Sequence, residues 1–457
     1  MRTKSAWLKY QGDYDDIFRV AEEYKRFISN CKTERECVKE AVLRAEKLGF
    51  CAWEKVLASG KKLQPGDKFY VNQDQKAIAL FVIGKEPLEK GMNILGAHID
   101  SPRLDLKSNP LYQDGEMALL DTHYYGGIKK YQWVTLPLAM HGVVVKKDGT
   151  VLSICIGEEE EDPVLGVNDL LVHLAQEQLK RNAATVVEGE DLDLTVGNIP
   201  LDEETDGIKK NILNILERKY NITEEDFLSS ELVLVPAGKA RDFGLDNSMI
   251  MAYGHDDKVC SYASLQAIFN MTNPVKTTCC LLVDKEEVGS YGASSMHSHF
   301  FLHVLSEMCH LNGQDSYLGM RRCLKNSHML SCDVNSCYDP LYAASMEKKN
   351  ASYLGHGVVF NKFTGSRGKN GSSEASAEYA SKIRSLMDDF SISYQFSELG
   401  RVDLGGGGTI AYIMADENVQ VIDSGIPVLS MHAPWEVISK VDLYEAVRAY
   451  QVFLEHC

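Results

Sequence analysis

The sequence predicts an α/β fold: a mixed, largely parallel sheet flanked by helices, with a β-rich domain inserted into it. After Tyr253, helix-like and strand-like segments alternate, as they do in parallel α/β proteins. Several of the strand-like segments are short, continuous apolar runs, which favour buried strands. Between about residues 103 and 240 the pattern changes to alternating polar and apolar positions, which indicates an insertion.

Two helices are expected at the start of the chain. The first is indicated by apolar residues at helical spacing, Ile17, Ala21, Tyr24 and Ile28. The second begins with a capping box of Thr33 and Glu36 and ends at Gly49. Two strands should follow, at Ala77–Ile83 and Met92–Ala97.

The inserted region should hold strands at Gly142–Val145 and Leu152–Ile156. A helix is expected at Leu170–Leu179, followed by a polar surface loop at Glu188–Glu204. The elements expected after it are helices at Tyr262–Phe269, His299–Met308, Ser373–Met387 and Leu443–Leu454, and strands at Thr277–Val283, Met329–Cys332, Val419–Asp423 and Pro427–Ser430.

Composition limits the classes of function. The 457 residues suggest two or three domains, and 44% hydrophobic with 25% charged residues is typical of a soluble globular protein. A net charge of -17 disfavours nucleic acid and anionic membranes as partners. The start lacks the apolar core of a secretory signal, and no run approaches the length of a membrane span. Twelve scattered cysteines indicate reduced thiols and a cytoplasmic protein.

Four apolar runs each end in a residue that can bind a metal. These runs are ILGAHID, LLVDKEEVG, MLSCD and VLSMH, which end at His98, Glu286–Glu287, Asp333 and His432. Sites in open α/β sheets assemble at the carboxyl ends of strands, so distant residues can converge there. Asp256 in GHDDKV, just before a helix, can join them.

Two histidines with several carboxylates suit Zn²⁺, Mn²⁺ or Co²⁺. Five ligands are too many for one tetrahedral zinc, whereas two ions about 3.5–4 Å apart can share a carboxylate, as in aminopeptidases and phosphatases. Each residue alone has an ordinary structural explanation, such as a helix N-cap for Asp256 or a solvated loop for DKEEVG. Only their shared placement indicates a two-metal hydrolase.

Other catalytic motifs are absent: the sequence holds no G-x-S-x-G, H-E-x-x-H or G-x-x-x-x-G-K-[ST]. The glycine run Gly405–Gly408 is interpreted as a tight turn at the substrate cleft, with Gly407 approaching the substrate. A plain flexible connector is the alternative for this run.

At these residues the sequence resembles the M18 metallopeptidase family, the aspartyl aminopeptidases and their vacuolar aminopeptidase I relatives. The resemblance covers nearly the whole chain. The motifs that carry it, in order, are AHIDSPRLDLK, YGG, HDDKVCSYASLQAI, DKEEVGSYGA, SCDVN, VDLGGGGTIA and PVLSMHAPWEV.

The resemblance implies that five side chains hold two ions: a bridging Asp256, with Glu287 and His432 on one ion, and His98 and Asp333 on the other. It places Glu286 at the general-base position. It also implies a discontinuous catalytic domain of residues 1–102 and 241–457, with an inserted dimerisation domain of residues 103–240. Such dimers would assemble into a tetrahedral dodecamer.

The sequence departs from the family pattern at positions that bear on specificity. Acidic-specific members have a histidine that reaches a neighbouring subunit, where this chain has Asp169, which weakens the case for acidic substrates. Lys362 falls near a family lysine that faces the substrate, although an exposed surface lysine explains it equally well. Asp257 stands where many members have Asn, a change that should keep the bridge intact.

The expected activity is removal of single N-terminal residues from peptides. A water of lowered pKa attacks the first peptide carbonyl, and Glu286 takes its proton and returns it to the leaving amine. A carboxypeptidase or amide deacylase with the same site is one alternative. A self-assembling scaffold with a vestigial site is the other, and metal-dependent activity distinguishes it.

Overall fold

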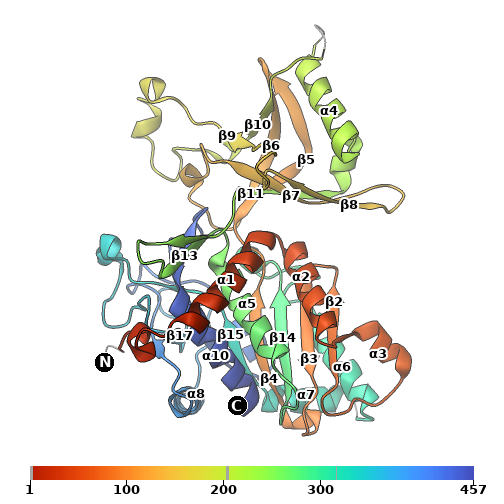
Figure 1. The fold of residues 1–457 in the computed structure, drawn as a ribbon, viewed down its shortest axis with the longest axis vertical. Helices are drawn as coiled ribbons and strands as arrows, with labels where there is room; N and C mark the ends of the chain where they lie inside the picture. Colours follow the sequence, from red (N-terminus) through yellow and green to blue (C-terminus); the bar gives the residue numbers. More distant parts are fainter. Residues whose placement is uncertain (1–3, 202–204, 315) are drawn as a thin grey trace. The chain divides into compact units, whose positions relative to one another are not determined.

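The computed structural model describes residues 4–201, 205–314 and 316–457. The chain forms two compact units (Figure 1). The first comprises residues 1–100, 240–431 and 436–457, and the second comprises residues 101–239 and 432–435. Both borders of the insertion lie within two residues of the expected ones, but the segment 432–435 falls in the second unit.

A nine-stranded mixed sheet forms the centre of the first unit. Its strands in spatial order are β1 (Cys51–Ala52), β2 (Lys68–Gln73), β3 (Ala77–Val82), β14 (Thr277–Val283), β4 (Met92–His98), β15 (His328–Cys332), β19 (Gln420–Gly425), β17 (Val358–Asn361) and β18 (Tyr394–Phe396). The four central strands β14, β4, β15 and β19 run parallel. Strand β3 is antiparallel to β14, and β17 is antiparallel to β19. The predicted mixed, largely parallel sheet is therefore confirmed.

Helices cover both faces of this sheet, and alternate residues of each strand serve the two cores. On one face lie α1 (Asp15–Asn30), α2 (Glu34–Lys47), α5 (His255–Phe269), α8 (Ala377–Asp389) and α10 (Lys440–His456). On the other lie α3 (Trp53–Ser59), α6 (Phe300–Leu311), α7 (Ser316–Asn326) and α9 (Ala411–Asp416). In β3, for example, Leu80 enters the first core and Phe81 the second.

A smaller five-stranded sheet also belongs to the first unit. Its order is β12 (Arg241–Phe243), β13 (Met249–Ala252), β21 (Glu436–Ser439), β20 (Pro427–Leu429) and β16 (Asn335–Ser336). Strand β20, which precedes His432, is thus not part of the nine-stranded sheet.

The second unit is built on a seven-stranded antiparallel sheet. Its order is β8 (Val151–Ile156), β7 (Leu138–Val145), β11 (Ser230–Pro236), β5 (Arg103–Asp114), β6 (Met117–Tyr125), β10 (Leu194–Gly197) and β9 (Gly166–Val167). A single longer helix, α4 (Gly207–Tyr220), packs against β5, β6 and β10 in the described part of this unit.

Three sequence predictions were wrong in part. The expected helix at Leu170–Leu179 is two short 3-10 turns, Val172–Leu174 and Gln178–Lys180. Its apolar side chains are mostly exposed, so the segment lacks the buried face that stabilises a helix. The expected loop Glu188–Glu204 contains β10, and its last three positions, 202–204, lie outside the described residues. Helix α8 begins four residues later than Ser373, after the N-cap Ser376.

The expected capping box is confirmed. The Thr33 hydroxyl accepts the Glu36 N–H at 3.3 Å, and the Glu36 carboxylate accepts the Thr33 N–H at 2.9 Å. Thr33→Ala should therefore lower the free energy of unfolding by about 1 kcal/mol, because an N-terminal donor of α2 loses its acceptor. Urea unfolding followed by circular dichroism measures this. Thr33→Ser keeps the acceptor and should stay close to wild type; equal losses in both variants would contradict the explanation.

All twelve cysteines are free thiols and nine are buried, which agrees with their expected packing as small apolar groups. Within the described residues, every helix is too short or too polar to span a bilayer.

Candidate metal centre

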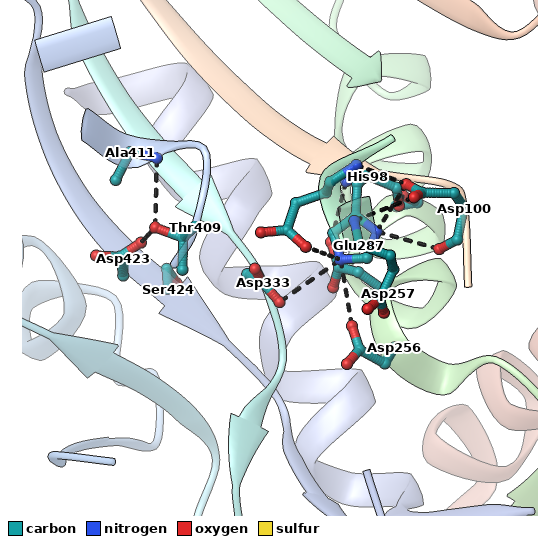
Figure 2. A network of polar contacts seen from close by, with 12 residues as sticks. His98, Asp100, Asp256, Asp257, Glu287, Asp333, Thr409, Ala411, Asp423 and Ser424 are labelled. Carbon is teal, nitrogen blue, oxygen red and sulfur yellow. Dashed lines mark hydrogen bonds and ion pairs between the residues drawn. The ribbon is translucent and has the colours of Figure 1, made fainter. Parts of the chain in front are cut away.

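Three adjacent parallel strands bring their carboxyl ends together at one edge of the nine-stranded sheet. His98 is the last residue of β4, and Asp333 directly follows β15. Glu286 and Glu287 lie in a short 3-10 turn, Glu286–Val288, just after β14. Because β14, β4 and β15 are neighbours in the sheet, these side chains meet, and Figure 2 shows Glu287 and Asp333 beside the His98 ring.

Helix α5 supplies the next carboxylates from its first turn. Asp256 and Asp257 have non-helical backbone angles there, and the peptide bond between them is cis. The Asp256 N–H donates to the buried Glu436 carboxylate at 3.0 Å. The Asp257 carboxylate accepts the backbone N–H of His98 at 3.3 Å. Hydrogen bonds thus tie the start of α5 to the end of β4.

The His98 ring is the centre of the cluster and is only 2% exposed. Its Nε2 lies 3.2 Å from an Asp256 oxygen, 3.8 Å from an Asp333 oxygen and 3.9 Å from a Glu286 oxygen. Two sets of donor atoms each lie within 4.8 Å of one another, and both contain His98. One set adds Glu286 and Asp333, and the other adds Asp256 and Glu287. Five of the six residues expected from the sequence are brought together in this way.

Sequence reasoning missed Asp100, which holds the centre in place. Its carboxylate lies 3.2 Å from Nδ1 of His98 and accepts the N–H groups of Glu286 at 3.2 Å and Glu287 at 3.1 Å. A carboxylate behind a ligating histidine fixes the ring orientation and its tautomer. The His-x-Asp spacing at a strand end was the available signal, since residues two apart on an extended chain point to the same side.

Burial and crowding shift the pKa values of these groups. Burial raises the pKa of Glu286 to about 8. For His98, burial acts to lower the pKa, but hydrogen bonds to carboxylates, first of them Asp100, outweigh it and raise the pKa. Burial also raises the pKa of Asp257. A divalent cation among these groups would favour the ionised carboxylates and the neutral form of the His98 ring.

His432 belongs to the second unit, so it is not among the residues gathered around His98 within the first unit. The strand-end argument does not apply to it, because β20 lies in the smaller sheet. Its Nδ1 lies 2.9 Å from the carbonyl oxygen of Gly127 in the YGG motif. A side chain at Gly127 would come within 3.4 Å of that nitrogen.

The three expected substrate residues belong to different parts of the chain. Asp169 is exposed in the second unit, where its carboxylate accepts the side-chain N–H of Gln178 at 3.1 Å. Lys362 is exposed just after β17. The carbonyl of Gly407 accepts the N–H of Gly365 at 2.9 Å.

The glycine run makes close backbone contacts rather than a loose connection. A Cβ at Gly405 would lie 1.7 Å from the carbonyl oxygen of Leu399. Gly406 has φ +137°, and a Cβ there would lie 2.4 Å from Cα of Ser366. After the run, the Thr409 hydroxyl donates to the Asp423 carboxylate at 2.7 Å, an interaction drawn in Figure 2.

The donor set of this centre fits a transition-metal ion. One imidazole nitrogen and several carboxylate oxygens are ligands that Zn²⁺, Mn²⁺ and Co²⁺ accept. The number of carboxylates around a single imidazole exceeds what one tetrahedral zinc uses. The arrangement can therefore serve metal-assisted hydrolysis.

Comparison with known proteins gives the same chemistry. The model of the family "Aminopeptidase I zinc metalloprotease (M18)" matches residues 27–454. A probable M18 family aminopeptidase 1 of Clostridium acetobutylicum is 55% identical, over 99% of this chain and 98% of that protein. One from Thermotoga maritima is 41% identical, over 100% of this chain and 99% of that protein.

Solved structures agree with the sequence relatives. The crystal structure of aminopeptidase I from Clostridium acetobutylicum matches with a TM-score of 0.93 at 54% identity, covering 99% of each chain. The M18 aminopeptidase from Thermotoga maritima matches with a TM-score of 0.95 at 40% identity, covering 100% of each chain. The chain therefore belongs to the M18 family of zinc metallo-aminopeptidases, as the motifs from AHIDSPRLDLK to PVLSMHAPWEV led us to expect.

Proposed function

We propose that this aminopeptidase works with two divalent ions, zinc in the first place and Mn²⁺ or Co²⁺ as alternatives. Five side chains would hold them: a bridging Asp256, with Glu287 and His432 on one ion, and His98 and Asp333 on the other. The observation that carries the proposal is the convergence of the carboxylates of Asp256, Glu286, Glu287 and Asp333 on the buried His98 ring. Such ions, when bound, lower the pKa of water and polarise a peptide carbonyl.

Glu286 would act as the general base of the reaction. Its carboxylate reaches to within 3.9 Å of the His98 ring nitrogen, so it borders the ligand cluster. Its backbone N–H is held by Asp100, which fixes the turn that presents the side chain. From this place Glu286 would accept a proton from the attacking water and return it to the leaving amine.

The products would be a free amino acid and a peptide shortened by one residue. A panel of aminoacyl anilides and their N-acetylated counterparts tests this after chelation and after addition of Zn²⁺, Mn²⁺ or Co²⁺. Free substrates should be hydrolysed only with a metal ion, and acetylation should stop hydrolysis. Chelator-resistant activity, or equal rates on acetylated substrates, would contradict the proposal.

We propose that an acidic N-terminal residue is not required. The position from which acidic-specific relatives reach a neighbouring site carries Asp169, an exposed carboxylate that would repel an acidic substrate. An activity confined to substrates with N-terminal Asp or Glu would show that Asp169 does not govern specificity.

We also propose that the chain self-associates through residues 103–240, first as dimers and then as a tetrahedral dodecamer. The segment Leu170–Leu179 supports this, since Val172, Leu174 and Leu179 are 67–69% exposed and apolar. Contiguous exposed apolar side chains often mark protein interfaces. A fold neighbour at 20% identity, mApe1 of Saccharomyces cerevisiae, is described as a dodecamer.

Replacing Val172 and Leu174 together by Asp should reduce the mass measured by light scattering, because charges would enter an apolar interface. Val275→Asp provides the control, since Val275 is also exposed but lies in the first unit, outside residues 103–240. An unchanged mass in the double variant would remove the segment from the interface. The free thiols support a reducing compartment, so we place the assembly in the cytoplasm.

A further inference from the structure

The loop that follows the proposed general base is closed back on itself. The N–H of Ser290 donates to the carbonyl of Lys285 at 2.7 Å, and the Ser294 hydroxyl donates to the buried Asp284 carboxylate at 2.8 Å. Tyr291 lies between these two closures. Gly289 lies three residues after Glu286, and a Cβ at Gly289 would lie 3.8 Å from the Tyr291 ring. The loop therefore holds an aromatic ring close to the catalytic turn.

Tyr291 is part of a three-ring stack. Its ring lies parallel to the His297 ring, with centroids 4.7 Å apart and an interplanar angle of 10°. Nε2 of His297 lies 2.9 Å from the hydroxyl of Tyr412, and these two rings meet edge to face at 5.8 Å. The His297 ring is thus flanked by both tyrosine rings, whereas Tyr291, at one end of the stack, is 71% exposed.

The stack joins the base loop to the glycine-rich segment. Tyr412 is the second residue of α9, which begins two residues after Thr409. Thr409 is in turn hydrogen-bonded to Asp423 on β19. Burial is the largest cause that raises the pKa of Tyr412, and the carboxylates of Asp416 and Glu286 act in the same direction. The N–H of Gly289 donates to the carbonyl of Glu286 at 3.0 Å, so the turn beside the Tyr291 ring is the turn that carries the base.

We propose that the exposed face of Tyr291 forms a side-chain subsite that receives a large apolar or aromatic residue next to the scissile bond. The inference rests on the proposed role of Glu286, because it is the position of the base that brings Tyr291 to the substrate. An aromatic face offers dispersion contact and stacking to such a side chain. Asp416 lies four residues after Tyr412 on α9, about one helical turn away, and its carboxylate disfavours an acidic side chain near the stack.

Two substrate series separate the two residues that flank the scissile bond. In the first series the N-terminal residue is Phe, Leu or Ala; in the second it is always Ala, and the following residue is Phe, Leu or Ala. The quantity compared is the ratio of kcat/KM for the Phe or Leu substrate to kcat/KM for the Ala substrate. A general loss of activity in a variant lowers kcat/KM for both substrates alike, so it does not change this ratio.

Tyr291→Ala should lower this ratio about tenfold in one of the two series, which is the usual size of a lost apolar contact in a pocket. The affected series identifies the residue that the subsite receives. Tyr291→Phe keeps the ring and should retain the wild-type ratio. Tyr317 on α7 is equally exposed, at 71%, so Tyr317→Ala is the matched control and should also retain it.

Three results would overturn the subsite: ratios within about twofold of wild type in both series for Tyr291→Ala, an equal change in Tyr317→Ala, or a Tyr291→Phe variant that behaves like Tyr291→Ala. Thermal melts of all variants show whether they fold alike. If wild type is active and only the ratios fail to respond, the subsite is wrong and the aminopeptidase assignment stands. Full activity of Glu286→Gln would instead contradict the role of the base.

Discussion

Glu286→Gln should reduce kcat by about 10²–10⁴-fold while the metal content stays at the wild-type value. The amide has nearly the same shape as the carboxylate but cannot accept a proton from water. Since Glu286 is assigned as the base and not as a ligand, the ions should bind as before. Steady-state kinetics and elemental analysis of the same preparation measure the two quantities.

The matched control is Glu307→Gln, a partly buried glutamate of helix α6, which should behave as wild type. If Glu286→Gln keeps kcat within a few-fold of wild type with its metal bound, another group must take the proton. If the variant instead loses its metal together with its activity, Glu286 is itself a metal ligand. Its place in one donor set with His98 and Asp333 would then reflect that role.

Asp256→Asn should lose both metal and activity. A carboxylate can bind two cations through its two oxygens, whereas an amide offers one weaker, neutral oxygen. Asp256 is the nearest carboxylate to Nε2 of His98, at 3.2 Å, so its charge lies at the centre of the cluster. Elemental analysis should find that the metal content falls well below wild type, and kcat should fall with it.

Asp257→Asn removes one carboxylate at the adjacent position. Its metal content is compared with that of Asp256→Asn. An Asn oxygen there can still accept the N–H of His98, which the Asp257 carboxylate now accepts at 3.3 Å. This variant should keep its metal. Equal metal loss in both variants would mean that total negative charge holds the ions, and that Asp256 has no special role as a bridge.

The sequence predicted the centre to the extent that the centre depends on parallel strands. His98, Glu286, Glu287 and Asp333 follow strands that the apolar runs identify, and these strands prove to be neighbours. The same reasoning does not extend to His432, because a short apolar run cannot show which sheet it joins. The strand-end argument had included His432, but only the family resemblance still supports that expectation.

Other features depend on packing that no local pattern reveals. The Leu170–Leu179 segment has helical spacing of apolar residues, but most of these side chains are exposed. Its backbone forms two short 3-10 turns instead of a helix. The support of Glu286 and Glu287 by Asp100 arises only when two distant strand ends meet. Position 405 requires glycine because a Cβ there would lie 1.7 Å from the carbonyl oxygen of Leu399, a contact that only the fold creates.

The proposed centre holds two metal ions around His98 and Asp256. The most direct measurement is anomalous diffraction at the zinc edge from crystals of the zinc-loaded enzyme. We expect two anomalous peaks per chain, both in contact with Asp256, one of them with His98 and Asp333 and the other with Glu287 and His432. A single peak, or peaks that do not touch Asp256, would contradict this account.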